Sequence, residues 1–129
     1  MHKVIISLAS NFQHEQHLRQ ARQILNQMLL HPRYTPQLWT EAVGKNCDKD
    51  QRYLNQLVTA STDMSCTELE TFLKETEIHL GRTEQLRQKG LVPIDLDLML
   101  YDRQRHHECD WSRSYMKPLL AMLSKLKES

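Results

Sequence analysis

The chain has 129 residues, of which 40% are hydrophobic and 26% charged, and its formal net charge is +1 at pH 7. This length suits one domain with a single core, and the small net charge excludes a strong overall attraction to nucleic acid or to a membrane surface. The apolar runs are too short for a membrane span or a secretory leader, and three cysteines without metal-like spacing favour a reducing compartment. We therefore expect one cytoplasmic domain over residues 1–129.

The first part of the chain predicts a strand followed by a helix. The nearly continuous apolar run from Lys3 to Leu8 is typical of a central, covered strand, and Ser10-Asn11 ends it. Pro32 is expected to stop the helix that follows. Apolar residues at helical spacing predict the buried face of this helix: Leu18, Ala21, Ile24, Leu25, Met28 and Leu29.

Two strands and a second helix are predicted next. The segments Thr35 to Val43 and Tyr53 to Thr59 are expected as strands, and the polar loop between them favours an antiparallel hairpin. Ser65 begins the second helix with a capping box, because Glu68 stands three residues later. Gly81 is expected to close this helix.

The last third of the chain predicts a loop, a strand and a final helix. Arg82 to Lys89 is expected as a polar loop, Ile94 to Tyr101 as a strand, and Tyr115 to Leu126 as a helix after a His- and Arg-rich connection. The resulting β-α-β-β-α-β-α order predicts an α+β fold of the ferredoxin-like class. In this fold an antiparallel sheet carries helices, which we expect on one face.

The predicted strand around Asp95 and Asp97 carries the most specific chemical signal. Its alternation places these two carboxylates and Met99 on one face. The two acids are then about 7 Å apart along the chain, at roughly 3.3 Å per residue. Carboxylate pairs suit Mg²⁺, which also binds substrate phosphates. The alternative is a pair of solvated acids on an open sheet. The opposite face of the strand is predicted to hold Ile94, Leu96, Leu98 and Leu100.

Four motifs in order resemble the 6-hydroxymethyl-7,8-dihydropterin pyrophosphokinase family of folate biosynthesis. The resemblance spans nearly the whole chain, and a weaker match runs from His107 through Arg113 to Tyr115 and Pro118-Leu119. Each motif alone is weak, whereas the set in family order is specific. The four motifs are Leu8-Ala9-Ser10-Asn11, Tyr53-Leu54-Asn55, Glu77-Ile78-His79-Leu80-Gly81-Arg82 and Asp95-Leu96-Asp97-Leu98-Met99-Leu100.

The resemblance implies transfer of a pyrophosphoryl group from ATP to the hydroxymethyl group of the dihydropterin, with release of AMP. It implies that Asp95 and Asp97 hold two Mg²⁺, which neutralise charge as the phosphoryl group moves. The expected partners are these two small molecules, without nucleic acid or membrane. The expected state of the protein is a monomer or a homodimer.

The resemblance also implies residues for the pterin. Asn55 would hydrogen-bond its amide-like edge, and the alternative is a polar strand residue facing solvent. Tyr53 would contact the pterin from the same strand face. Tyr115 would stack on the ring, and the alternative is a core-facing aromatic residue at the start of a helix.

The remaining predicted site residues concern the nucleotide. Arg82 and Arg113 would pair with phosphates through their guanidinium groups. Arg82 is expected to act in catalysis together with Asp95 and Asp97. His107 would donate to a phosphate oxygen, and the alternative is a surface loop histidine. Glu77 would make a polar contact near the nucleotide, and the alternative is a surface acid at a helix end. Ser10 and Asn11 are expected to shape the turn after the first strand.

The chain departs from the family pattern at several positions. Val92 replaces a phosphate-binding arginine of the family, and Glu84 and Lys89 stand where the family has arginine and tryptophan. Ala9 replaces a glycine, Glu41-Ala42-Val43-Gly44 replaces a Thr-Pro-x-x-Gly segment, and the stretch from Asp97 to His107 is short. The departures leave two alternatives to an active enzyme. One is a non-catalytic binder of pterin, nucleotide or a protein, and the other is a structural module without ligand.

Overall fold

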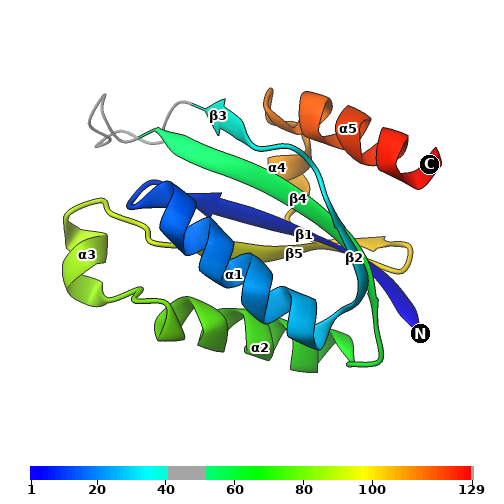
Figure 1. Ribbon diagram of the computed structural model, residues 1–129, viewed down its shortest axis with the longest axis horizontal. Helices are drawn as coiled ribbons and strands as arrows, with labels where there is room; N and C mark the ends of the chain where they lie inside the picture. Colours follow the sequence, from blue (N-terminus) through cyan, green and yellow to red (C-terminus); the bar gives the residue numbers. More distant parts are fainter. Residues whose placement is uncertain (41–51, 129) are drawn as a thin grey trace.

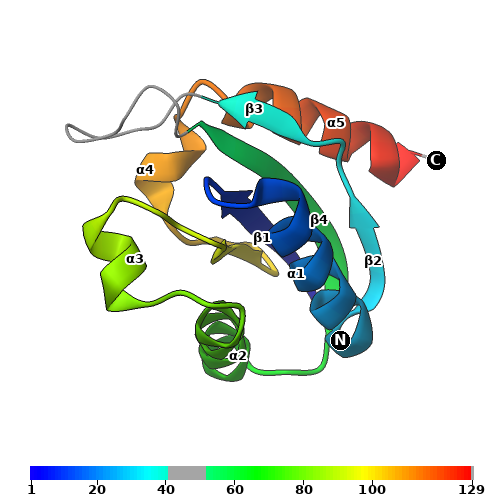
Figure 2. The ribbon, with the colours of Figure 1, turned by 60° about the vertical axis from the view of Figure 1, so that its left-hand side comes forward.

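The computed structural model describes residues 1–40 and 52–128 of the chain. Its strands form an antiparallel sheet, and helices pack on both faces of this sheet (Figures 1 and 2). In chain order they are β1 (His2–Ser10), α1 (His14–Met28), β2 (Leu30–Tyr34), β3 (Leu38–Thr40), β4 (Tyr53–Thr62), α2 (Cys66–His79), α3 (Glu84–Gln88), β5 (Asp95–Tyr101), β6 (Gln104–Arg105), α4 (Glu108–Trp111) and α5 (Met116–Glu128).

The sheet has the order β2-β4-β1-β5-β6 among the described residues, and β3 also pairs with β4. All of these pairings are antiparallel. Strand β1 lies at the centre, and it pairs with β4 without interruption from His2 to Ser10. The predicted α+β class, the central first strand and the antiparallel hairpin partner of β4 are confirmed.

Two hydrophobic cores lie on the two faces of the sheet. On one face, α1 and α2 cover inward residues of β1 such as Ile6 and Leu8. On the other face, α5 packs through Leu119 and Leu123 against residues that include Leu57 of β4. The expectation that all helices lie on one face is therefore wrong. The reason is that β1, β4 and β5 carry apolar residues on both faces of the sheet, and α5 covers the second face.

Strand β5 follows the predicted alternation only as far as Leu98. Leu96 and Leu98 belong to the core under α1 and α2, as expected. The register with β1 then shifts between Ile5 and Ile6, so that Met99 has no single partner. A bulge of this kind turns the following residue to the other face. Leu100 therefore packs with Met99 against the α5 core, and its predicted placement with Leu98 is wrong.

Several predicted boundaries also change. Of the strand expected from Thr35 to Val43, the described residues form only β3, and residues 41–43 lie outside the described part of the chain. The edge strand β2 ends at Tyr34, before this segment, and was not predicted. Helix α1 ends at Met28, and Pro32 lies within the edge strand β2, where no inner ladder bond is lost.

The connections around β5 contain more structure than predicted. The segment expected as a loop contains α3, whose first turn is capped by the Thr83 hydroxyl accepting from Leu86 N–H at 3.2 Å. The His- and Arg-rich connection contains β6 and α4. Short single-turn helices lack the repeated apolar spacing that identifies longer ones.

The predicted ends of α2 are confirmed. The Ser65 hydroxyl accepts from Glu68 N–H at 3.1 Å, and the Glu68 carboxylate accepts from Ser65 N–H at 3.1 Å. At the other end, Gly81 has a φ of +110°, a conformation that glycine adopts without strain. None of the helices in the described ranges combines the length and the apolar character that a membrane span requires.

Candidate active site

A pocket of about 170 Å³ opens on the α5 side of the sheet, where the ends of β1, β4 and β5 meet the segment that carries α4. Its floor is the central strand β1, which contributes only the small residues Ser7 and Ala9. Larger side chains on both neighbouring strands therefore rise above this strand and form walls. The lining residues are Ser7, Ala9, Thr40, Tyr53, Asn55, Asp95, Asp97, Met99, Asp110, Arg113, Tyr115 and Met116.

Strand register brings the two predicted halves of the site together. Ala9 pairs with Asn55 of β4 on one side and with Asp95 of β5 on the other, so these three residues form one row across the sheet. Neighbouring strands lie about 4.8 Å apart, which places the row's outer Cα atoms roughly 10 Å from each other. Asp97 pairs with Ser7 in the next row. An amide and two carboxylates thus share one concave surface.

The two aspartates face the pocket, and each also contacts a basic side chain. Arg82 Nη1 lies 3.1 Å from Asp95 Oδ1, and Lys74 Nζ lies 3.3 Å from Asp97 Oδ1. Burial raises the pKa of Asp97, and the charge of Asp95 raises it further, while Lys74 and His107 lower it. The site therefore combines two acids with two cations at its edge and leaves open space beside the acids.

Glu77 lies behind the aspartates and is only 4% exposed, so its interpretation as a surface acid is wrong. Its carboxylate accepts from Leu96 N–H at 2.7 Å, from Lys74 at 3.1 Å and from Arg82 at 2.9 Å. Lys74 also donates to the Leu96 carbonyl at 3.1 Å. Burial raises the pKa of Glu77, against the lowering effects of Leu96 N–H and Lys74.

These contacts satisfy the backbone groups of Leu96 on the outer edge of β5. The short strand β6 pairs only with Leu100 and Tyr101, so no strand within residues 1–40 and 52–128 adjoins the edge at Leu96. Side chains of α2 take that place: Glu77 accepts from the backbone N–H and Lys74 donates to the carbonyl. Buried backbone groups need such partners. The same two side chains position Arg82 and Asp97, so edge capping and site geometry depend on one cluster.

Two of the residues predicted for the pterin, Asn55 and Tyr53, lie on β4, and the third, Tyr115, precedes α5. Asn55 is 4% exposed, so the alternative of a solvent-facing strand residue is wrong. Its amide nitrogen donates to Thr40 Oγ1 at 2.6 Å, which fixes the orientation of the side chain. Tyr53 lines the same wall. Tyr115 both lines the pocket and packs against the α5 core, so the two interpretations proposed for it are compatible.

Arg113 and His107 come from the segment around α4. Arg113 lines the pocket, and its Nε donates to Asp110 Oδ1 at 2.9 Å. His107 is the residue directly before α4 and has a φ of +54°, and its Nε2 lies 3.8 Å from Asp97 Oδ1. Burial and the charge of Asp110 raise the pKa of Tyr115. Because Asp110, Arg113 and Tyr115 all line the pocket, the segment around α4 forms its third wall.

Asn11 holds the chain that leads into β5. Its side-chain nitrogen donates to the Gly90 carbonyl at 2.9 Å, and its oxygen accepts from Val92 N–H. Ser10 Oγ donates to the Phe12 carbonyl at 3.1 Å. Both residues shape this turn, as the sequence predicts. The backbone of Val92 is therefore held on both its N–H and its carbonyl by Asn11.

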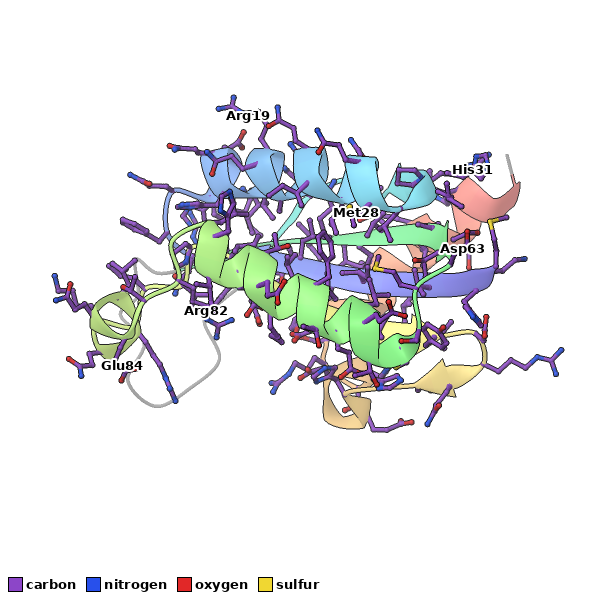
Figure 3. The ribbon with its side chains drawn as sticks, turned by 90° about the horizontal axis from the view of Figure 1, so that it is seen from below. Arg19, Met28, His31, Asp63, Arg82 and Glu84 are labelled. Atoms are coloured by element: carbon purple, nitrogen blue, oxygen red, sulfur yellow. The ribbon has the colours of Figure 1, made fainter. Side chains whose placement is uncertain are left out.

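The charged residues of the α3 segment lie away from the pocket. Figure 3 shows Arg82 beneath the end of α2, whereas Glu84 projects from α3 on the far side. Glu84 pairs with Arg87 at 3.7 Å, and both side chains are exposed. The described residues that line the pocket include neither Arg87 nor Lys89.

Lys74 and Asp110 were not identified from the sequence. Lys74 precedes Glu77 by three residues on α2, and Asp110 precedes Arg113 by three, so each pair shares one face of a helical turn. This spacing is the signal that points to them. Spacing alone cannot say that the face carrying Lys74 meets the edge of β5.

Comparison with known proteins gives a family match over residues 5–125, to the family described as 7,8-dihydro-6-hydroxymethylpterin-pyrophosphokinase. The chain is 31% identical over 131 residues to the "Folate synthesis bifunctional protein, mitochondrial" of Pisum sativum, covering 94% of this chain and 25% of that protein. The protein of the same name in Arabidopsis thaliana is 30% identical over 132 residues, covering 95% and 24%. The chain thus spans about a quarter of the length of these curated relatives.

Proposed function

Because the chain belongs to the 7,8-dihydro-6-hydroxymethylpterin-pyrophosphokinase family, we propose that it transfers pyrophosphate from ATP to 6-hydroxymethyl-7,8-dihydropterin. The observation that supports this most is the shared pocket surface of Asn55, Asp95 and Asp97. One side of the pocket presents an amide for a flat heterocycle, and the other presents carboxylates for a cation. The names of both relatives place them in folate synthesis, and we propose the same pathway here.

The donor set at the acidic side fits Mg²⁺. Asp95 and Asp97 offer only carboxylate oxygens, and hard oxygen donors suit Mg²⁺ better than softer metals. Bound there, Mg²⁺ supplies charge neutralisation for phosphoryl oxygens. We propose that Asp95 and Asp97 together hold two Mg²⁺. Lys74 and Arg82 hold the two carboxylates in place from the edge of the sheet.

The chain's own residues supply orientation and positive charge. Asn55, with its amide fixed by Thr40, would read the polar edge of the pterin, while Tyr53 and Tyr115 would contact its ring. Arg113 and His107 would meet phosphates from the α4 side. Arg82 is held by Glu77 and Asp95, so its guanidinium is oriented before substrate arrives.

The test is formation of AMP from ATP, Mg²⁺ and 6-hydroxymethyl-7,8-dihydropterin. We expect turnover by the unaltered chain and a loss in Asp97→Asn of about 3 kcal/mol in transition-state stabilisation, on the order of a hundredfold in rate. Asp63→Asn is the matched control, because Asp63 is exposed and lies outside the pocket lining. Absence of AMP at saturating substrate would refute the proposed activity.

A specific observation favours a second candidate, a non-catalytic binder. Val92 stands where the family has a phosphate-binding arginine, and Arg87 and Lys89 are not among the described pocket residues. Loss of one such charge can remove about 3 kcal/mol of transition-state stabilisation. Calorimetric binding of pterin without AMP formation would support the binder, and turnover would exclude it. A cytoplasmic location and a monomeric or homodimeric state stay predictions.

A further inference from the structure

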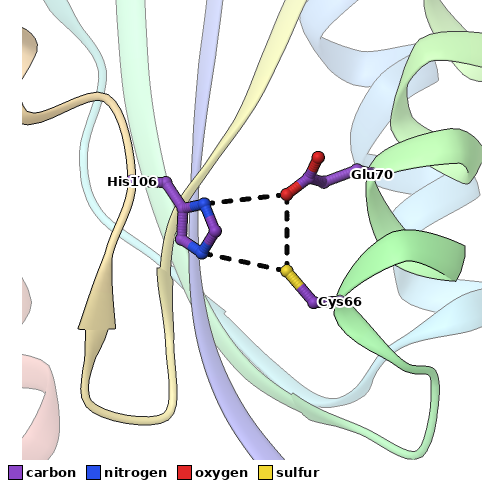
Figure 4. Close-up of side chains that lie close together, drawn as sticks. All are labelled: Cys66, Glu70 and His106. Atoms are coloured by element: carbon purple, nitrogen blue, oxygen red, sulfur yellow. Dashed lines mark hydrogen bonds and ion pairs between the residues drawn. The ribbon is translucent and has the colours of Figure 1, made fainter.

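Cys66, Glu70 and His106 form a cluster separate from the candidate active site. Cys66 Sγ lies 3.3 Å from Glu70 Oε1 and 3.8 Å from His106 Nε2, and His106 Nδ1 lies 3.6 Å from the same glutamate oxygen (Figure 4). One ligand atom from each residue can be chosen so that all three lie within 4.8 Å of one another. A thiol, a carboxylate and an imidazole therefore converge at one point.

Two independently anchored elements present these three groups. Cys66 and Glu70 are one turn apart at the start of α2, so their side chains share one face. His106 follows β6, where its N–H donates to the Met99 carbonyl at 2.9 Å and its carbonyl accepts from Trp111 Nε1 at 2.9 Å. The backbone contacts hold His106 opposite α2 without using its ring.

The separations of the ligand atoms are close to those around a tetrahedral metal. Zn²⁺ binds sulfur at about 2.3 Å, imidazole nitrogen at about 2.0 Å and carboxylate oxygen at about 2.1 Å. Tetrahedral angles then place neighbouring ligand atoms about 3.4–3.6 Å apart. Cys66 Sγ lies 3.3 Å from Glu70 Oε1 and 3.8 Å from His106 Nε2, while the 3.6 Å contact to Glu70 uses the other ring nitrogen, Nδ1. With one ring nitrogen as ligand, the three ligand atoms lie within 4.8 Å of one another. Small side-chain rotations would bring all three to ligand distance.

We propose that Cys66, Glu70 and His106 bind a divalent transition metal of the Zn²⁺ class, with water in the fourth position. Thiolate and imidazole donors favour such a metal over Mg²⁺ or Ca²⁺. On binding, the Cys66 thiol loses its proton to solvent and a metal–sulfur bond forms, without any change of oxidation state. The bound metal links α2 to the segment that begins at His106 and carries His107 and Arg113.

A reactive thiol is the competing interpretation of the same cluster. Burial raises the pKa of Cys66, and its hydrogen bond and charge interaction with Glu70 raise it further. A thiol with a raised pKa stays protonated at neutral pH and is a weak nucleophile. A metal can still displace that proton, so the acidic neighbour suits a ligand set better than it suits a nucleophile.

The test uses Co²⁺ as a spectroscopic probe of the 129-residue chain in which Cys47 and Cys109 are both changed to Ser. We expect one equivalent of Co²⁺ to give thiolate-to-cobalt charge-transfer absorption, displaced by Zn²⁺. Cys66→Ser should abolish this absorption, and Glu70→Gln should weaken Co²⁺ binding by about tenfold or more. Glu75→Gln, an exposed glutamate on the same helix, and Asp97→Asn should both leave it unchanged.

Absence of thiolate absorption, or its persistence in Cys66→Ser, would overturn the proposal. Because binding at Asp95 and Asp97 gives no thiolate band, failure of this site is distinguishable from failure of the proposed function. A second measurement follows amide hydrogen exchange over residues 104–113. Zn²⁺ should slow it in the parent chain and not in Cys66→Ser, and equal exchange in both would refute the link between α2 and α4.

Discussion

Glu77 shows how much one buried residue can organise. Its carboxylate accepts from a backbone N–H of β5 and pairs with Lys74 and Arg82, which in turn hold Asp97 and Asp95. A charged group this far from water is stable only when its oxygens are fully used. Here they are used to fasten the end of α2 to the strand that carries the acidic pair.

We expect Glu77→Ala to lower the free energy of unfolding by about 2–3 kcal/mol. The change leaves Leu96 N–H without its acceptor and removes the shared partner of two cations, which are themselves partly exposed. Glu77→Gln, which retains an acceptor, should lose less. Urea denaturation measures these values, with Glu75→Ala as the exposed control expected to change by less than about 0.5 kcal/mol. Equal stability of Glu77→Ala and the control would contradict this role.

At the scale of elements, neighbouring segments are joined by specific polar contacts that local sequence patterns do not reveal. Tyr34 on β2 donates to Asn26 Oδ1 of α1 at 2.8 Å and lies 3.3 Å from the Arg22 carbonyl. This contact holds the edge strand β2 against the helix that precedes it. Burial raises the pKa of Tyr34 to about 12, with a smaller opposing effect from Arg22.

The raised pKa of Tyr34 predicts a specific loss of stability in alkali. The neutral phenol is favoured in the folded state, so its contribution is complete below the unfolded pKa of about 10 and falls as the pH rises toward 12. Two pKa units correspond to about 2.7 kcal/mol, and partial exposure reduces the expected loss to about 1 kcal/mol.

Tyr34→Phe isolates this effect. The stability difference between the parent chain and Tyr34→Phe should be constant below pH 10 and should shrink between pH 10 and 12, as measured by chemical denaturation at each pH. A tyrosinate absorbance titration should lose one late-ionising group in Tyr34→Phe, whereas Tyr115, whose pKa is also raised, should still ionise late. A constant difference up to pH 12 would show that the phenol titrates normally.

Helix ends could be predicted from the sequence, whereas details of strand pairing could not. The capping box at Ser65 and the glycine end of α2 depend on residues a few positions apart, so the sequence identifies them. The bulge at Met99 was missed, because it depends on how β5 pairs with β1. Strand β2 was also missed, because its pairing with β4 at the edge of the sheet decides it.

At the scale of the molecule, the sheet separates two cores, and the pocket belongs to the α5 side. Met116 both lines the pocket and lies in that core, so packing of α5 sets one wall of the site. The core under α1 and α2 instead supports the back of β5. Changes in the two cores should therefore differ in their effect on the pocket.

We expect Leu119→Ala, on α5, to lower the free energy of unfolding by about 2–4 kcal/mol, because this side chain is buried in the α5 core. Leu25→Ala in α1 should cost a similar amount in the other core. Only Leu119→Ala should also weaken pterin binding measured by calorimetry, since Tyr115 and Met116 lie beside it. Equal binding by the two variants would show that α5 does not support the pocket.

Sequence by itself determined the family-like motifs, the alternation that places Asp95 and Asp97 on one face, and the order of the main elements. These depend on residues close together in the chain, where backbone geometry alone sets which side chains share a face. Only the tertiary structure decided that Asn55 and Asp95 lie across Ala9, that Glu77 is buried, and that α5 covers a second face. Those outcomes depend on strand register and on which apolar faces pack together, and both are properties of the whole chain.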